Sequence, residues 1–338
     1  MIVDERFAVR TAREVVSAAK PPPAGELEAL VHEMKEDALT AQDLVVDAFL
    51  LDQDRSDEVR ARLAAGSVLV LDQVGWIKAN AESLNGMVDV SALPAEPGPA
   101  SRRAAAAEVA GVLSLLSTRV LGQFDPFARE TGRLMFVAPS ILIAEEAMKV
   151  TPKDFRMWVA LHEATHQVQF ATAPWLREHM RSLLSQVVAT PLQAPGLSTI
   201  AEVFAVLGRI IRGQASMVDL IRNEGMRAAL TDASAILSLL EGHADVVMDE
   251  VGLGVIPSVG KLRRRFEARR DAGQGGFLSN LLGMDLKLAQ YRDGAKFVRE
   301  IRREVGQTGF GAVWDRPENL PTSAEIHAPR LWLDRVHG

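Results

Sequence analysis

The sequence predicts a mainly α-helical protein, with at most a small β element preceding the helix that carries residues 162–166. Apolar residues recur at intervals of three and four through residues 25–52, 56–88 and 102–124, which is the period of a helix with one buried side. The best strand candidate is residues 132–143, GRLMFVAPSILI, because the segment is rich in Val, Ile and Phe, starts at a glycine and is split by a proline.

Composition excludes several classes of protein. The formal net charge of -6 argues against a dedicated nucleic-acid binder, because phosphate contacts need a surplus of Lys and Arg. The chain has no cysteine, so a metal would have to be held by His, Asp and Glu. The longest apolar runs are shorter than the roughly 18 residues of a membrane-spanning helix, and the first residues do not resemble a signal peptide. We therefore expect a cytoplasmic protein that binds neither nucleic acid nor membrane, whose oligomeric state is unknown.

A segment rich in Pro, Ala and Gly, residues 91–101, interrupts the helical pattern. It predicts a boundary between an N-terminal helical subdomain, residues 1–92, and a metal-binding catalytic subdomain, residues 102–338. The alternative is a long loop within one continuous domain.

The segment MWVALHEATHQVQF, residues 157–170, places two histidines and a glutamate in an apolar helix. Thr151 is the expected N-cap, Pro152 the first helical residue, and Pro174 the end of the helix. His162 and His166 share a helix face, and two imidazoles at this spacing can bind one zinc ion. Glu163 lies about 100° further round the helix, where it suits a general base for a metal-bound water. The alternative is a pair of ordinary hydrogen-bonded histidines.

A catalytic zinc needs a third protein ligand and one open position. Residues 231–252 predict a second helix, with Thr231 as N-cap and the polar cluster EGHAD in its middle. Glu241 and Asp245 are four residues apart and share a face. We interpret Glu241 as the third ligand and Asp245 as the acceptor that fixes a ligand histidine. Asp245 as the ligand itself, or an acidic face in solvent, are the alternatives.

At these residues the chain resembles the zincins, and in particular the gluzincins, in which His-Glu-x-x-His is followed on a second helix by Glu-x-x-x-Asp. Over most of its length after residue 130 it is similar to the zincin-like metallopeptidase family 2. The matching segments are MFVAPSIL, HEATH, EGHAD, KLAQYRDGAKFV and WDRPENLPTSAEIHAPRLWLDRV. This family groups bacterial proteins described as hydrolases, and one branch is named for an association with deazaflavin coenzyme biosynthesis.

The resemblance implies a zincin-like fold, zinc bound by His162, His166 and Glu241, and Glu163 as the general base. It also implies that Asp245 contacts a ligand histidine, and that a strand bordering the cleft pairs with extended substrate. Segment 133–143 is the candidate for that strand, although its continuous apolar residues fit an interior strand equally well. The separation of 75 residues from His166 to Glu241 is longer than in well-studied gluzincins.

Further residues are candidates for supporting roles. Tyr291, the only tyrosine in the chain, is the first candidate for stabilising an oxyanion, with Lys287 one turn earlier, and His243 is the second. Tyr291 is equally interpretable as a buried residue with a satisfied hydrogen bond, and for His243 an ordinary hydrogen-bonded histidine is the favoured interpretation. The basic run GKLRRRFEARR, residues 260–270, fits an anion site or, more simply, a solvated helix face.

The predicted function is a zinc-dependent metallohydrolase, most simply a metallopeptidase, acting on a peptide, a protein or a small amide. The alternative is a structural or regulatory metal-binding protein without peptidase activity. A di-iron carboxylate protein is a third interpretation, because EATH is also a Glu-x-x-His motif, but that class needs two such motifs and the chain has one.

Overall fold

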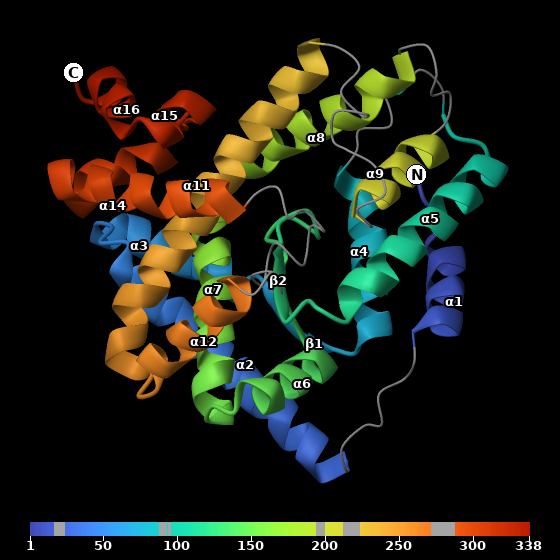
Figure 1. The fold of residues 1–338 in the computed structure, drawn as a ribbon, viewed down its shortest axis with the longest axis horizontal. Helices are drawn as coiled ribbons and strands as arrows, with labels where there is room; N and C mark the ends of the chain where they lie inside the picture. The colour runs from blue at the N-terminus through green and yellow to red at the C-terminus, as the bar shows by residue number, and fades with distance from the viewer. Residues whose placement is uncertain (17–23, 88–92, 94–95, 194–199, 212–223, 272–287) are drawn as a thin grey trace.

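The structure is a computed structural model that describes residues 1–16, 24–87, 93, 96–193, 200–211, 224–271 and 288–338. Its helices are α1 (Glu5–Val15), α2 (Ala24–Ala48), α3 (Gln53–Ala64), α4 (Gln73–Met87), α5 (Pro99–Ser117), α6 (Ala138–Met148), α7 (Pro152–Thr172), α8 (Trp175–Gln193), α9 (Ile200–Ile211), α11 (Glu224–Val255), α12 (Val259–Asp271), α14 (Leu288–Phe310), α15 (Ser323–His327) and α16 (Pro329–Val336). The strands are β1 (Ser67–Leu71), β2 (Gly122–Asp125) and β3 (Arg133–Val137). A mainly helical fold with a small β element before α7 is confirmed (Figure 1).

The three strands form one sheet in the order β1-β3-β2. β3 pairs in parallel with β1 and antiparallel with β2. It therefore lies in the centre of the sheet, which decides between the two interpretations of segment 133–143: it is an interior strand, and β2 is an edge. The strand ends at Val137, and APSILI belongs to α6, because Pro139 suits the first turn of a helix.

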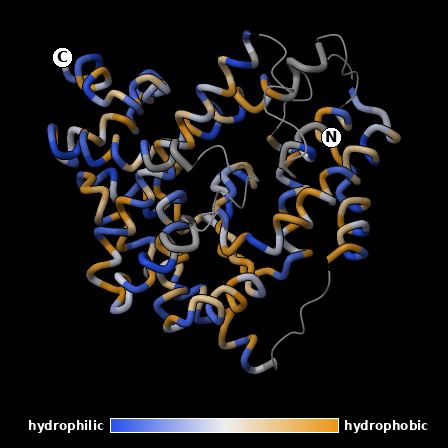
Figure 2. The backbone as a smooth tube through the Cα atoms, viewed as in Figure 1, coloured by the Kyte–Doolittle hydropathy of each residue, from blue (hydrophilic) through white to orange (hydrophobic). Residues whose placement is uncertain are grey.

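The sheet separates two apolar clusters, and the alternation of side chains along β3 explains how. Leu134 and Phe136 pack into the cluster formed with α2, α7, α11 and α14. Met135 and Val137 point to the opposite face and pack with α1, α4 and α5. A strand buried on both faces has continuous apolar residues. The helices carry polar and apolar residues along their length, so each can turn an apolar side inward (Figure 2).

α7 lies in the middle of the molecule, between α11 and the sheet (Figure 1). It also packs against α2, so the N-terminal helices contribute directly to the surroundings of the motif helix. The boundary expected between residues 92 and 102 stays a prediction, and most of residues 88–95 lie outside the described residues.

Two expectations about elements were wrong. Residues 67–71 form β1, not part of a helix. The second motif helix, α11, begins at Glu224 rather than after Thr231. Thr231 lies inside the helix, where its hydroxyl donates a hydrogen bond to the Arg227 carbonyl four residues back instead of accepting one as an N-cap would. Within the part of the chain that the structure describes, no helix is both long and apolar enough to cross a membrane.

Candidate metal centre

α7 has the bounds that its sequence predicts, from Pro152 to Thr172. Apolar residues such as Leu161, Ala164 and Val168 are completely buried and fix the helix in the core. His162 and His166 consequently project together from its middle. Their rings are perpendicular with centroids 4.7 Å apart, and their Nε2 atoms are 3.2 Å apart.

α11 brings the Glu241 carboxylate to the same point. One carboxylate oxygen lies 3.7 Å from His162 Nε2, and the other lies 3.4 Å from His166 Nε2. One possible ligand atom from each of the three residues lies within 4.8 Å of the other two. Glu241 follows His166 by 75 positions in the chain, but helix packing places two imidazoles and a carboxylate around one point. We call these three residues the ligand cluster.

The pKa values of the two histidines in the ligand cluster are shifted in opposite directions. Burial, helped by the neighbouring His166, lowers the pKa of His162 to about 4, although Glu241 opposes this shift. Burial would also lower the pKa of His166, but the Glu241 carboxylate outweighs it, with help from Glu163 and Gln169, and raises that pKa to about 9. A negative carboxylate beside two imidazoles is a donor set that suits Zn²⁺, so the residues present fit this metal.

Glu163 lies on the neighbouring face of α7, toward β2. Its Oε2 accepts a hydrogen bond of 3.1 Å from the backbone N–H of Phe124. Oε1 is buried and has no hydrogen-bond partner among the described residues. Burial and the nearby Glu241 raise the pKa of Glu163 to about 8, against the opposing effects of His166 and the Phe124 N–H. The carboxyl group is thus held at one oxygen and presents the other, with a raised proton affinity.

The backbone of β2 was not predicted to belong to the site. In the antiparallel pairing with β3, Val137 donates to the Leu121 carbonyl, so the polar groups of the alternate residues Gly122 and Phe124 point away from β3. Glu163 occupies this free edge. A Cβ atom on Gly122 would lie only 2.6 Å from Glu163 Cγ, so this position requires glycine. The glycine of LGQF, residues 121–124, was the feature of the sequence that could have indicated this close approach.

The structure brings together His162, Glu163, His166 and Glu241. His243 is on α11 but points elsewhere: it is completely buried, between the rings of Phe49, Phe310 and Trp314. Burial, followed by Arg302 and His166, lowers its pKa to about 3. It contacts Gln169 rather than the ligand cluster, and its role as a proton donor stays a prediction.

Two other predicted residues also remain untested. Asp245 lies one turn after Glu241 and is half-buried, whereas the outer nitrogen of His166 is hydrogen-bonded to Gln169 and Met248 Sδ lies 3.1 Å from His162 Nδ1. Tyr291 belongs to α14, but its side chain and Lys287 lie outside the described residues.

The basic run 260–270 lies in α12, and several of its side chains have structural partners. Lys261 donates to the Lys149 carbonyl and Arg265 to the Met148 carbonyl, while Arg263 pairs with Asp249. These contacts anchor α12 to α6 and α11 and favour a structural role over an anion site for these three residues.

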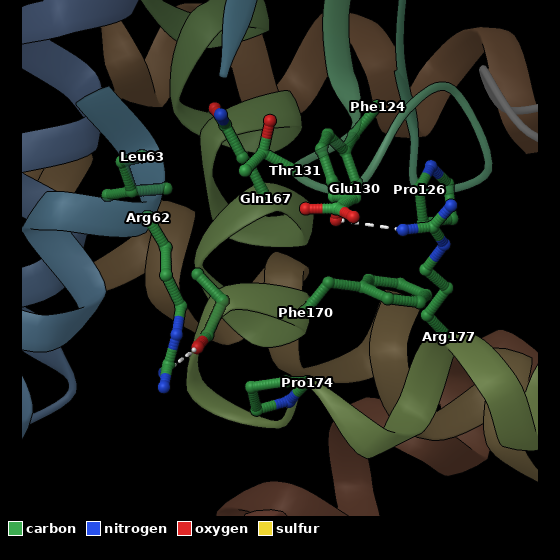
Figure 3. Close-up of a pocket in the computed structure, with 11 residues that line it drawn as sticks. Arg62, Leu63, Phe124, Pro126, Glu130, Thr131, Gln167, Phe170, Pro174 and Arg177 are labelled. Atoms are coloured by element: carbon green, nitrogen blue, oxygen red, sulfur yellow. Dashed lines mark hydrogen bonds between the residues drawn. The ribbon is translucent and has the colours of Figure 1, made fainter. Parts of the chain in front are cut away.

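A small pocket lies beside the last turns of α7, where Gln167 and Phe170 line it (Figure 3). Its walls include Leu63, Phe124, Phe170 and Pro174, with the guanidinium groups of Arg62 and Arg177 at its sides. The Phe124 and Phe170 rings pack with centroids 5.6 Å apart. Because the backbone of Phe124 holds Glu163 and its ring lines the pocket, β2 connects the two features.

Comparison with known proteins identifies the family to which a chain with this site geometry belongs. The family model described as zincin-like metallopeptidase matches residues 3–333. The chain belongs to this family. A solved structure from Chloroflexus aurantiacus, described as a putative hydrolase with a novel fold, is 26% identical to the chain and has a TM-score of 0.68, with 99% of each chain covered. No curated protein matches the chain. The zincin-like family and this structural relative support a metallohydrolase in general.

Proposed function

We propose that the protein is a zinc-dependent hydrolase of peptide or amide bonds. The observation that carries this proposal is the convergence of the ligand cluster with Glu163 on one side of α7. His162, His166 and Glu241 would hold the metal. When bound, zinc would lower the pKa of a coordinated water and polarise a carbonyl oxygen.

The residues of the chain then have separate tasks. The Phe124 N–H fixes Oε2 of Glu163, which leaves Oε1 free to accept a proton from an attacking water. Burial raises the pKa of Glu163, which would help it to hold the proton and return it to a leaving amine. Burial of the carboxyl group excludes bulk water from this transfer.

The pocket beside Phe124 offers a place for a substrate side chain next to the scissile bond. Its aromatic and aliphatic walls suit an apolar group, whereas the guanidinium groups of Arg62 and Arg177 are bonded to the carbonyls of Ala171 and Glu130. These features favour a peptide as the substrate over a small amide without side chains.

The first test measures metal. Purified wild-type protein is expected to contain about one zinc ion per chain, and His162→Ala is expected to lose it, because two remaining ligands bind zinc weakly. His32→Ala is the matched control, since the His32 side chain is 76% exposed and far from the motif helix in sequence. Folded wild-type protein without zinc would overturn the proposal.

The second test separates catalysis from a structural or regulatory metal site. Glu163→Gln keeps the size of the side chain and its acceptor for the Phe124 N–H, but removes the base. With a library of internally quenched fluorescent peptides as substrate, we expect kcat to fall by about 10²–10⁴-fold while zinc content stays at the wild-type level. Equal cleavage by the variant would exclude Glu163 as the base. A zinc-loaded wild type that cleaves none of these peptides would contradict peptidase activity.

A further inference from the structure

We propose that Gln169 is a positioning residue that fixes His166 in the tautomer needed for metal binding and ties it to the helix that carries Glu241. This inference rests on the proposed function. Gln169 lies in α7, three residues after His166, and is completely buried. Its Oε1 is 3.0 Å from His166 Nδ1, on the side of the imidazole that faces away from the ligand cluster.

The orientation of the Gln169 amide follows from its other contacts. Its Nε2 lies 2.9 Å from the carbonyl oxygen of Leu240, which can only accept a hydrogen bond. The same Nε2 lies 3.2 Å from His243 Nδ1. The two N–H groups of the amide therefore have two acceptors. The reverse orientation would bring two carbonyl oxygens together in a buried environment and leave both without a donor.

This orientation fixes the histidine. Because the amide oxygen only accepts, Nδ1 of His166 must carry the proton. A neutral His166 then has its lone pair on Nε2, the atom that faces Glu241 at 3.4 Å. A neutral imidazole is the form that binds metal, and of its two neutral tautomers the hydrogen bond to Gln169 selects the one that leaves Nε2 of His166 for the metal.

The amide also connects the two metal-binding helices. Leu240 directly precedes Glu241 in α11, so one side chain of α7 is bonded both to a ligand histidine and to the backbone beside the acidic ligand. His243, held between Phe49 and Phe310, supplies the second acceptor. The distance between His166 and Glu241 is consequently set by a hydrogen-bonded bridge in addition to apolar packing.

The experiment compares Gln169→Met, which keeps the size of the side chain but has no amide acceptor, with Gln169→Glu. As a neutral acid, Glu can still accept from His166 and donate to the Leu240 carbonyl. The matched control is Gln167→Met, because Gln167 is a buried glutamine in the same helix whose oxygen accepts a 2.7 Å hydrogen bond from Gln42 instead. Melting temperatures establish that each variant is folded.

Zinc affinity is measured by competition with a chromophoric chelator. We expect Gln169→Met to weaken the zinc dissociation constant by about 10–100-fold, Gln169→Glu to recover most of that loss, and Gln167→Met to bind as the wild type does. In ¹⁵N-edited spectra of the zinc-loaded wild type, His166 should show a slowly exchanging Nδ1–H proton. That signal should be lost in Gln169→Met and kept in the control.

Wild-type affinity in Gln169→Met, or an equal loss in Gln167→Met, would overturn the positioning role while leaving the zinc site itself intact. A wild type that binds no zinc would instead overturn the proposed function, and this inference with it. The two failures are therefore distinguishable in one series of titrations.

Discussion

At the scale of single residues, the position of Glu163 depends on a neighbour that has no side chain. Gly122 lies on β2, at a position where an added Cβ atom would meet the Glu163 side chain. Gly122→Ala would place a methyl group 2.6 Å from Cγ and 3.0 Å from Oε1 of Glu163, so the carboxyl group must move. We expect kcat on the best peptide substrate to fall by about 10–100-fold, since displacements near 1 Å can have effects of this size, with zinc content unchanged.

Gly111→Ala is the control for this substitution, because a Cβ atom at Gly111 in α5 would meet nothing within 4 Å. Its activity should equal that of the wild type. Unchanged kcat in Gly122→Ala would mean that the Glu163 carboxyl group does not need the position observed here.

At the scale of elements, two glycines determine how closely α11 and α14 approach. A Cβ atom on Gly242 would lie 2.1 Å from the Gly294 carbonyl carbon, and one on Gly294 would lie 1.9 Å from the Ser238 carbonyl oxygen. Backbone meets backbone here, so no side-chain rearrangement can relieve the clash. The glycine of EGHAD is thus explained by helix packing rather than by chemistry.

Gly242→Ala should therefore destabilise the protein. Alanine gains about 0.5–1 kcal/mol over glycine within a helix, but forcing the helices apart costs typically 1–3 kcal/mol or more, so the clash dominates. Urea unfolding should show a net loss in the free energy of unfolding. Gly254→Ala, in the same helix with nothing within 4 Å of the added Cβ, should be neutral or slightly stabilising. Equal stability of the two variants would contradict this account of the crossing.

At the scale of the whole molecule, the features predicted best from the sequence were those that lie within a single helix. The cap residues of α7 and the spacing of its histidines are local signals, and both the helix bounds and the convergence of the side chains followed from them. β1 was missed because SVLVL, a short apolar run, reads equally well as part of a buried helix. β2, with only four residues, is too short for a periodic signal.

The parts of the site that were not predicted depend on contacts between segments that are far apart in the sequence. The Phe124 N–H reaches Glu163 across 39 residues, and a backbone donor has no signature in sequence. Gln169 reaches the Leu240 carbonyl across 71 residues. The sequence did contain a signal that Gln169 has a specific role, because Gln169 is a polar residue three positions after His166 on a helix face that is otherwise buried. Its partner, the Leu240 carbonyl, could be identified only from the fold.

The stability of the whole molecule should also depend on the pH through one buried acid. Asp37 of α2 is only 7% exposed, and its Oδ2 has no hydrogen-bond partner among the described residues. Burial and the nearby Glu33 and Glu36 raise its pKa to about 6, although Lys153 and Arg156 of α7 oppose the shift. The folded state therefore binds this proton more tightly than the unfolded state, in which the pKa of Asp37 is near 3.8.

The sign of the effect follows from this difference. Below pH 3.8 both states are protonated and Asp37 costs no stability, whereas above about pH 6 the folded state must hold a buried carboxylate. Asp37→Asn removes that cost, so its advantage over the wild type should be absent near pH 4 and reach about 1–2 kcal/mol at pH 8. Urea unfolding of both proteins at pH 4, 6 and 8 measures it. Glu178→Gln is the control, because the Glu178 side chain is 72% exposed and is not among the charges that shift the pKa of Asp37, so it should leave the pH profile unchanged. A constant difference between Asp37→Asn and the wild type at all three pH values would show that the Asp37 carboxyl group does not titrate in this range in the folded protein.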